Sequence, residues 1–160
     1  MLRNPVTIAP LAEDNIEAAR TLTVKPFQEV FSGQPIDLLS KSEAGISVHV
    51  IKKKDLVVGM FRVDTRFHFN HTFMQPDTSG IRNFIIDQNK QGQGLGTETC
   101  RMMPAYLRGV IPMARGVYLM MNITNAGAYK ACIKGGWNDT GDKYTLGRTG
   151  PQHILCMPLR

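Results

Sequence analysis

Short runs of apolar residues alternate with polar or glycine-rich turns along most of the chain, a pattern typical of strands in a half-buried sheet. Residues 46–51 and 56–63 predict a hairpin whose turn contains Lys53, Lys54 and Asp55. Gly59 within the second of these strands indicates a bulge or a close backbone approach. The other runs that predict strands are 6–9, 81–87, 116–123, 144–146 and 153–157.

Helical segments fall between these strands. Asp14 and Glu17 have the spacing of a capping box, which predicts a helix running toward Leu22. Pro104 should kink a helix that starts near Thr97, or end it early. The remaining predicted helices are 35–41 and 125–134, while 67–79 shows no clear pattern and reads as a hairpin extension or a mobile loop. The order of elements predicts an α/β (α+β) fold with a mixed, mostly antiparallel sheet.

Length and composition indicate an ordinary globular protein. The chain has 160 residues, of which 42% are hydrophobic and 20% charged, and this predicts one domain over 1–160. Residues 1–5 lack the apolar run of a signal peptide, and no stretch reaches the length of a membrane span. The three cysteines show no CxxC spacing, so we expect free thiols, a reducing compartment and a cytoplasmic location.

The formal net charge of +6 is compatible with three partners: nucleic acid, an anionic membrane surface or a phosphorylated ligand. The only basic run, Lys52-Lys53-Lys54, lies at the predicted hairpin turn, where a solvated role is the simpler interpretation. Because no interleaved aromatic residues or known binding motif accompany the charge, we expect neither a nucleic-acid nor a membrane partner.

The strongest chemical signal is a strand that runs into a glycine-rich turn and then a helix, at residues 85–97. Glycine allows positive φ and close approach of backbone N–H groups to a phosphate, and the helix start adds unpaired donors and partial positive charge. The turn is therefore a candidate pyrophosphate site. The glycines are spaced differently from the Gly-x-Gly-x-x-Gly of Rossmann folds, and the Gly-Lys-Ser/Thr of a Walker loop is missing. A glycine-rich turn without any ligand stays open as an alternative.

Two motifs in this order resemble those of the GNAT acetyltransferases. Residues 91–96, Gln-Gly-Gln-Gly-Leu-Gly, match the family's Arg/Gln-x-x-Gly-x-Gly/Ala, with Ile86 at the apolar position five residues before. Residues 125–137 match the Asn, Ala, Lys and Gly of its second motif, with Trp137 replacing Phe. The resemblance covers about residues 46–140 and implies the GNAT fold, in which the central strands 81–87 and 116–123 splay apart. The subfamily signal is weak and is nearest to the polyamine-type enzymes.

The resemblance also implies acetyl-CoA as co-substrate. Phe84 and Ile86 would lend backbone groups to the pantetheine arm and the acetyl carbonyl, like an added strand. Asn125 would contact the cofactor from the second motif. The pyrophosphate would be held by the glycine-rich turn and the start of its helix, that is by Gln91, Gly92, Gln93, Gly94, Leu95, Gly96 and Thr97.

The expected catalytic groups depart from the family pattern. The tyrosine that usually protonates the thiolate falls at Cys132, and Tyr129, one turn earlier, is a substitute. A packing role is open for both residues. The acidic residue of polyamine-type enzymes falls at Arg82, which is not a base at neutral pH. Other candidates for the base are Glu29, which lies in the aromatic patch 27–31 beside the expected acceptor site, and Asp77, His68, His71 and His153. Because His68 and His71 have no third ligand nearby, we expect no metal site.

The sequence thus predicts an N-acetyltransferase that moves acetyl from acetyl-CoA to a primary amine of a small molecule by direct attack in a ternary complex. Acetylation of a protein or peptide amine is the alternative within enzymes. A non-catalytic acyl-CoA-binding module is the alternative from another class, because the usual tyrosine and carboxylate are missing. Homodimers are common in the family, so the resemblance leaves a homodimer open.

Overall fold

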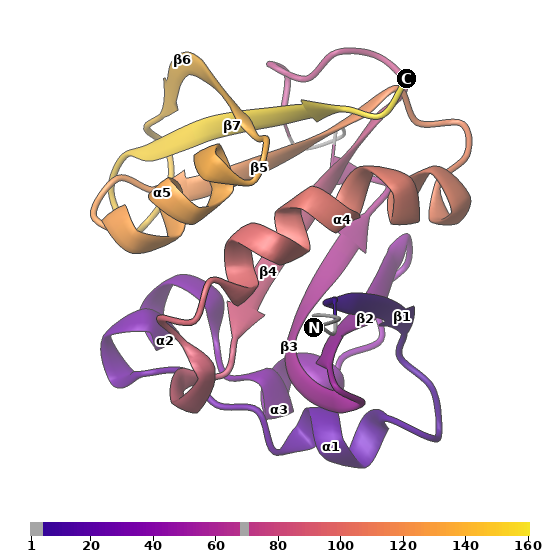
Figure 1. Cartoon of the computed structure of the whole chain (residues 1–160). Coiled ribbons are helices and arrows are strands. Elements are labelled where there is room, and N and C mark those ends of the chain that lie inside the picture. The colour runs from indigo at the N-terminus through magenta and orange to yellow at the C-terminus, as the bar shows by residue number, and fades with distance from the viewer. Residues whose placement is uncertain (1–4, 68–70) are drawn as a thin grey trace.

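The computed structural model describes residues 5–67 and 71–160. Seven strands form one sheet in the order β1-β2-β3-β4-β5-β7-β6, in which only β4 and β5 run parallel (Figure 1). The strands are β1 (Thr7–Pro10), β2 (Ile46–Lys53), β3 (Leu56–Asp64), β4 (Thr78–Ile86), β5 (Gly116–Asn122), β6 (Asn138–Tyr144) and β7 (Gln152–Pro158). The prediction of a mixed, mostly antiparallel sheet flanked by helices is confirmed.

Within the described residues, five α-helices and the 3-10 turn η2 connect these strands. They are α1 (Ile16–Arg20), α2 (Pro26–Ser32), α3 (Pro35–Leu39), η2 (Gln88–Lys90), α4 (Leu95–Val110) and α5 (Ala126–Lys134). The prediction at Asp14 was wrong: Asn15 is the N-cap residue of α1. Its amide is buried and bridges Ala12 N at 2.8 Å and Pro10 O at 3.0 Å.

Three further differences from the sequence prediction concern element type or extent. The aromatic patch 27–31, for which no element was predicted, belongs to helix α2. This helix begins with Pro26 at its first position, where the missing proline N–H costs nothing. Helix α4 continues through Pro104 to Val110 instead of ending early. Strand β6 starts at Asn138 and ends at Tyr144, so Leu146 lies beyond it.

The two faces of the sheet are covered by different helices. Apolar residues of α4 and α5, such as Met103, Leu107 and Cys132, pack with β3 and β5 into the largest core cluster. The opposite face packs against α1 and α3 through Ala19 and Leu38. Residues of β5 alternate between these faces, so that Leu119 and Met121 face α4 and α5, whereas Met120 lies in a separate cluster on the other side.

A buried polar network crosses the core between β2 and α4. His49 is 2% exposed, and its ring nitrogens contact the Ser47 hydroxyl at 2.8 Å and the Tyr106 hydroxyl at 2.6 Å. Burial lowers the pKa of His49 to about 4 and raises the pKa of Tyr106 to about 12. Both groups are therefore neutral in the fold at physiological pH.

Candidate functional site

The parallel strands β4 and β5 separate after a short paired stretch. Their ladder contains only the pairs Thr78–Gly116, Ser79–Val117 and Gly80–Tyr118, although both strands continue well past it. Figure 1 shows the two strands diverging beneath α4. The backbone groups that face the gap thus have no partner strand, which is the arrangement that an extended ligand arm requires.

A bulge in β4 marks the position where the strand turns into this gap. Met60 pairs with Ile85 and Arg62 with Arg82, so Asn83 and Phe84 together oppose one residue of β3. Asn83 has a φ of 52°, in the left-handed region that asparagine tolerates better than most residues. Bulges of this kind redirect a strand and its side chains.

The Asn83 side chain fixes the bulge from two directions. Its carbonyl oxygen accepts a hydrogen bond from Arg62 Nε at 2.8 Å, and its amide nitrogen donates to the Ser32 carbonyl at 2.9 Å. The buried Arg62 in turn contacts Glu43 at 3.2 Å, and this hydrogen bond lowers the pKa of the Glu43 carboxyl. Sequence reasoning missed Asn83; an asparagine inside a β-rich run was the only signal.

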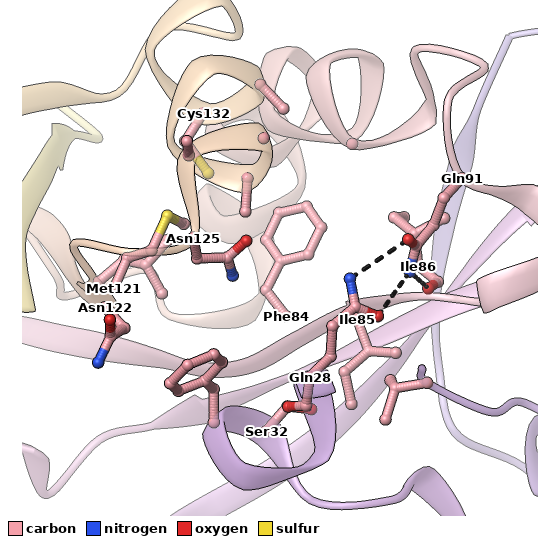
Figure 2. A pocket seen from close by; sticks show the side chains of 18 of the residues that line it. Gln28, Ser32, Phe84, Ile85, Ile86, Gln91, Met121, Asn122, Asn125 and Cys132 are labelled. Atoms are coloured by element: carbon pink, nitrogen blue, oxygen red, sulfur yellow. Dashed lines mark hydrogen bonds between the residues drawn. The ribbon is translucent and has the colours of Figure 1, made fainter. Parts of the chain in front are cut away.

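A cavity of about 630 Å³ fills the gap between β4 and β5. Its wall combines residues from both faces of the sheet, which means that the cavity passes through the sheet between the two strands. Figure 2 shows Cys132 of α5 on one side of β4, and Gln28 and Ser32 of α2 on the other. The volume and the mixed apolar and polar lining are typical of a small-molecule site.

The glycine-rich turn opens onto one end of this cavity. Gly92 and Gly94 have φ values of 79° and 78°, conformations that favour glycine. A Cβ atom added at either position would meet no other atom within 4 Å. The positive φ accounts for the choice of glycine at both positions, and the open space beside them leaves room for a ligand at the backbone. Both residues, together with Leu95, Gly96 and Thr97 at the start of α4, line the cavity.

Gln91 holds this turn against β4 and α2. Its Nε2 donates to the Ile86 carbonyl at 3.0 Å and to Gln28 Oε1 at 3.1 Å, and Gln28 Nε2 donates back to Gln91 Oε1 at 3.3 Å. The paired amides connect α2 with the glycine-rich turn. Gln28 was not singled out from the sequence, because nothing in the local pattern shows which distant residue it contacts.

The other residues expected at the cofactor are also brought together here. Phe84, Ile86 and Asn125 line the cavity, and Figure 2 shows Asn125 and Phe84 on the same side of it. Gln93 lies in the same turn, between the two open glycines, but it is exposed and does not line the cavity. The space at Gly92 and Gly94, the unpaired helix start and the unpaired strand edge together fit a ligand with a pyrophosphate and an extended arm.

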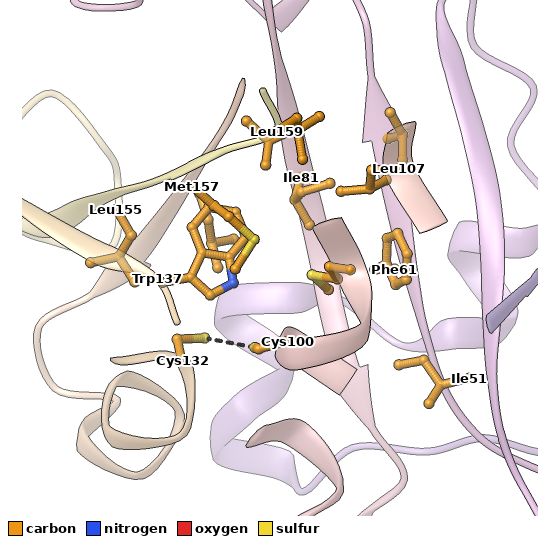
Figure 3. Close-up of a cluster of buried hydrophobic side chains, with 14 of the residues drawn as sticks. Ile51, Phe61, Ile81, Cys100, Leu107, Cys132, Trp137, Leu155, Met157 and Leu159 are labelled. Atoms are coloured by element: carbon orange, nitrogen blue, oxygen red, sulfur yellow. Dashed lines mark hydrogen bonds between the residues drawn. The ribbon is translucent and has the colours of Figure 1, made fainter. Parts of the chain in front are cut away.

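Cys132 lies at the cavity wall and also belongs to the core. The Cys100 thiol donates to Cys132 Sγ across 3.9 Å, and both residues are buried beside Trp137 (Figure 3). This hydrogen bond and burial raise the pKa of Cys100 well above its usual range, so its thiol stays protonated. All three cysteines of the chain are free thiols.

Tyr129 points to β6 and β7 instead. Its hydroxyl donates to Asp139 Oδ2 at 2.8 Å, and its ring stacks on His153 with centroids 4.3 Å apart. The hydrogen bond to Asp139 raises the pKa of Tyr129. The Asp139 carboxyl has a lowered pKa because Gly141 N and Tyr129 donate to it. Tyr129 and His153 are both outside the set of described residues that line the cavity.

The remaining candidates for the base do not line the cavity, and one of them lies outside the residues that the structure describes. Glu29 is exposed on α2 and its carboxylate accepts from Gln34 at 3.3 Å. The His71 ring lies against Phe67 in a tilted arrangement, with centroids 4.3 Å apart, and burial lowers the pKa of His71. Asp77 precedes β4 and its carbonyl accepts from Arg115 N. Arg82 pairs with Asp64 at 3.2 Å, and His68 lies outside the described residues.

The described residues contain neither a metal-binding cluster nor a membrane-spanning helix. Over 5–67 and 71–160, no group of three or more His, Cys, Asp or Glu side chains is placed to hold a metal ion. None of the helices in this part of the chain combines the length and apolarity that a membrane span needs.

The chain is similar to known proteins in structure but not in sequence. No protein-family model and no curated protein matches the chain. The aminoglycoside acetyltransferase AAC(6')-Ib in complex with acetyl-CoA matches with a TM-score of 0.76 at 15% identity, over 96% of this chain and 93% of that chain.

Two bacterial structures are similar over the same extent. Spermidine N-acetyltransferase from Vibrio cholerae, in complex with CoA and spermine, matches with a TM-score of 0.68 at 13% identity, over 96% of this chain and 95% of that one. An acetyltransferase of the GNAT family from Bacillus anthracis matches with a TM-score of 0.69 at 11% identity, over 99% and 98%. The splayed strands and the glycine-rich turn lie within these shared regions, and the chain therefore has the GNAT fold.

Proposed function

We propose that the chain is an acetyl-CoA-dependent N-acetyltransferase that acts on a primary amine of a small molecule. The observation that carries the proposal is the unpaired gap between β4 and β5, which opens at one end on two glycines whose backbone faces empty space. The proteins of similar structure include acetyltransferases in complex with acetyl-CoA or CoA. Acetyl-CoA would supply the acetyl thioester.

The chain's own groups would bind and orient this co-substrate. Backbone N–H groups of Gly92–Thr97 would receive the pyrophosphate, where the start of α4 adds partial positive charge. Phe84 and Ile86 would offer backbone groups of the unpaired β4 edge to the arm and to the acetyl carbonyl, where an N–H stabilises negative charge that develops on oxygen. Asn125 would contact the arm from α5.

In the proposed reaction the amine nitrogen bonds to the acetyl carbon and the carbon–sulfur bond breaks. The nitrogen loses one proton and the CoA thiolate gains one, so the products are the acetylated amine and the free CoA thiol. A thiol has a pKa of about 8.5, so the thiolate needs little assistance. Of the three proposed catalytic residues, only Cys132 lines the cavity; Tyr129 and Glu29 would need a rearrangement to reach it. Holding the two reactants together is therefore the main contribution that we assign to the protein.

Release of the CoA thiol tests this function. Acetyl-CoA is incubated with the protein and a panel of polyamines, amino acids, aminoglycosides, arylalkylamines and short peptides, and the free thiol is measured over time. We expect thiol release that depends on both the protein and a small amine. Binding of acetyl-CoA without release for any member would instead support the acyl-CoA-binding module, and release only with peptides would support a protein acceptor.

Three further properties belong to the same proposal. The free thiols favour a reducing, cytoplasmic setting, residues 1–160 would act as one domain, and a homodimer stays open because relatives of this fold family often form one. Size-exclusion chromatography with light scattering distinguishes a monomer from a dimer.

A further inference from the structure

The acceptor end of the cavity lies on the side of the sheet that faces α2. Leu95 at the start of α4 and Cys132 belong to the core on the other side, whereas Gln91 of the glycine-rich turn contacts Gln28 of α2. A ligand arm placed in the gap would thus leave one free approach, which is bounded by α2, the bulge of β4 and the far ends of β5 and β7. These elements contribute Phe27, Phe31, Asn83, Met120 and Gln152 to the lining of the cavity.

No ionisable side chain lines that approach among the described residues, and over the whole cavity Cys132 is the one titratable group that does so. The chain contains 13 acidic residues, yet none of those in the described ranges faces the cavity. The exposed Glu29 on α2 bonds to Gln34 instead. A polyamine or an aminoglycoside would bring several ammonium groups to a wall that offers no carboxylate, on a chain whose net charge is +6. Burying such charges without partners is unfavourable.

Three polar side chains of the approach, those of Asn83, Asn122 and Ser32, already have partners in the fold. Asn83 bonds to Arg62 and Ser32, and Asn122 donates to the Thr149 carbonyl at 2.6 Å while its oxygen accepts from Thr124. The Ser32 hydroxyl donates to main-chain carbonyls of its own segment. A hydroxyl-rich acceptor would have to break these bonds to be recognised.

The apolar side chains of the approach, in contrast, are exposed. Phe27 and Phe31 lie one turn apart on the same face of α2, and they are 66% and 38% exposed. Both line the cavity, as does the half-buried Met120 of β5. Large exposed aromatic side chains at the mouth of a cavity are suited to bind an apolar or aromatic body.

We propose that the acceptor is a primary monoamine carried on an aromatic or apolar body, such as an arylalkylamine, and that Phe27 and Phe31 determine this preference. The inference rests on the proposed acetyltransferase function and narrows its substrate class. It separates this chain from the proteins of similar fold whose structures contain an aminoglycoside or spermine. Such a monoamine brings one ammonium group, and this group must lose its proton in any case before the nitrogen can react.

Steady-state kinetics with 2-phenylethylamine, spermidine and kanamycin as acceptors tests the proposal, with Phe27→Ala and Phe31→Leu as variants. Val30→Ala is the matched control, because Val30 is also 66% exposed on α2 but does not line the cavity. We expect kcat/KM for 2-phenylethylamine to exceed that for either polycation by about tenfold or more. Each phenylalanine variant should lose about tenfold in kcat/KM for 2-phenylethylamine. The KM for acetyl-CoA and all constants of Val30→Ala should stay unchanged.

The reciprocal variant Met120→Glu places a carboxylate on the acceptor wall and should shift the preference toward spermidine. Spermidine or kanamycin as the better acceptor of the wild-type protein would overturn the substrate class and leave the acetyltransferase function standing. Equal losses of kcat/KM in Val30→Ala and Phe27→Ala would also overturn the proposed substrate class. Acetyl-CoA binding without turnover of any acceptor would overturn both the substrate class and catalysis. The absence of acetyl-CoA binding would overturn the proposed function itself.

Discussion

The side-chain oxygen of Asn83 accepts a hydrogen bond from Arg62 Nε at 2.8 Å, and this contact holds β4 in its bulge. Asn83 adopts a φ of 52° there, and its side-chain amide nitrogen donates to the Ser32 carbonyl at the end of α2. One side chain thus connects the strand that enters the gap, its neighbour β3 and the helix that carries Phe27 and Phe31. The position of the acceptor wall relative to the gap depends on it.

Replacement of Asn83 by glycine should separate the backbone requirement from the side-chain contacts. Asn83→Gly keeps the positive φ without strain but leaves the buried Arg62 Nε without this acceptor, which should lower the free energy of unfolding by about 1–3 kcal/mol. We expect kcat/KM for the amine to fall by about tenfold, because a misplaced acceptor wall impairs positioning. Urea unfolding and thiol-release kinetics measure the two effects. Wild-type values of both would show that the bulge does not need this side chain.

Gly94→Glu should abolish cofactor binding. A side chain at this position enters the open space beside the turn and its carboxylate repels the pyrophosphate, so Kd for acetyl-CoA should rise by about 100-fold or more. Gly141→Glu is the matched control, because Gly141 also has a positive φ of 86° and open space around it but lies on β6. Isothermal titration calorimetry compares the two variants. An unchanged Kd for Gly94→Glu would show that the pyrophosphate does not bind at this turn.

The buried histidine of β2 should make stability depend on pH. The folded state lowers the pKa of His49 to about 4, below the value of about 6.5 in an unfolded chain. The unfolded state therefore binds more protons between these values, and the stabilisation present above pH 6.5 is lost as the pH falls toward 4. The loss from this one group is on the order of 3 kcal/mol. Urea unfolding of wild type and His49→Gln from pH 7 to pH 4 measures it.

The glutamine variant serves as the control, because its amide retains hydrogen-bonding groups toward Ser47 and Tyr106 without titrating in this range. Its stability should fall less steeply than that of the wild type over the same range. The lowered pKa of His71 contributes with the same sign in both proteins, so it cancels in the comparison. Parallel curves for the two proteins would mean that His49 is not the group responsible.

The two candidate acids of α5 should contribute little to turnover. Tyr129 is engaged with Asp139, and Cys132 is a core residue paired with Cys100. We expect Cys132→Ala and Tyr129→Phe each to keep kcat within about threefold of the wild type, since a thiolate leaving group needs only modest assistance. Thiol-release kinetics across pH provide the measurement. A loss of about 100-fold in kcat for either folded variant would assign that side chain the role of general acid.

Local patterns were sufficient to predict much of the fold. The alternation in 46–63 and the pair Lys54–Asp55 predicted the hairpin of β2 and β3, and both turn residues have positive φ in the structure. Gly59 was expected at a bulge or close approach, and a Cβ there would lie 2.3 Å from the Ile85 carbonyl. Helix α2 was missed because its seven residues are too few for the helical spacing of Phe27, Val30 and Phe31 to be recognised as a periodic pattern. All three side chains remain exposed.

The site was predictable where it is contiguous in sequence and unpredictable where it is assembled from distant segments. The turn 91–97 has its own glycine signal, so its residues were identified without the fold. The contacts of Gln28 with Gln91 and of Asn83 with Arg62 span 63 and 21 positions, and no local pattern encodes them. Tyr129 shares a helix with Cys132, but its direction is set by Asp139 on β6, which sequence spacing does not show.

Titration of acetyl-CoA into the wild-type protein tests the central claim most directly. Backbone amides at the glycine-rich turn and along the unpaired edge of β4 should bind one molecule per chain with a Kd of about 1–100 μM, equivalent to a binding free energy of about −8 to −5 kcal/mol. Calorimetry with CoA and dephospho-CoA under the same conditions should give affinities of similar size. No detectable heat or affinity for any of the three, with a folded protein, would contradict the assignment of the gap as a cofactor site.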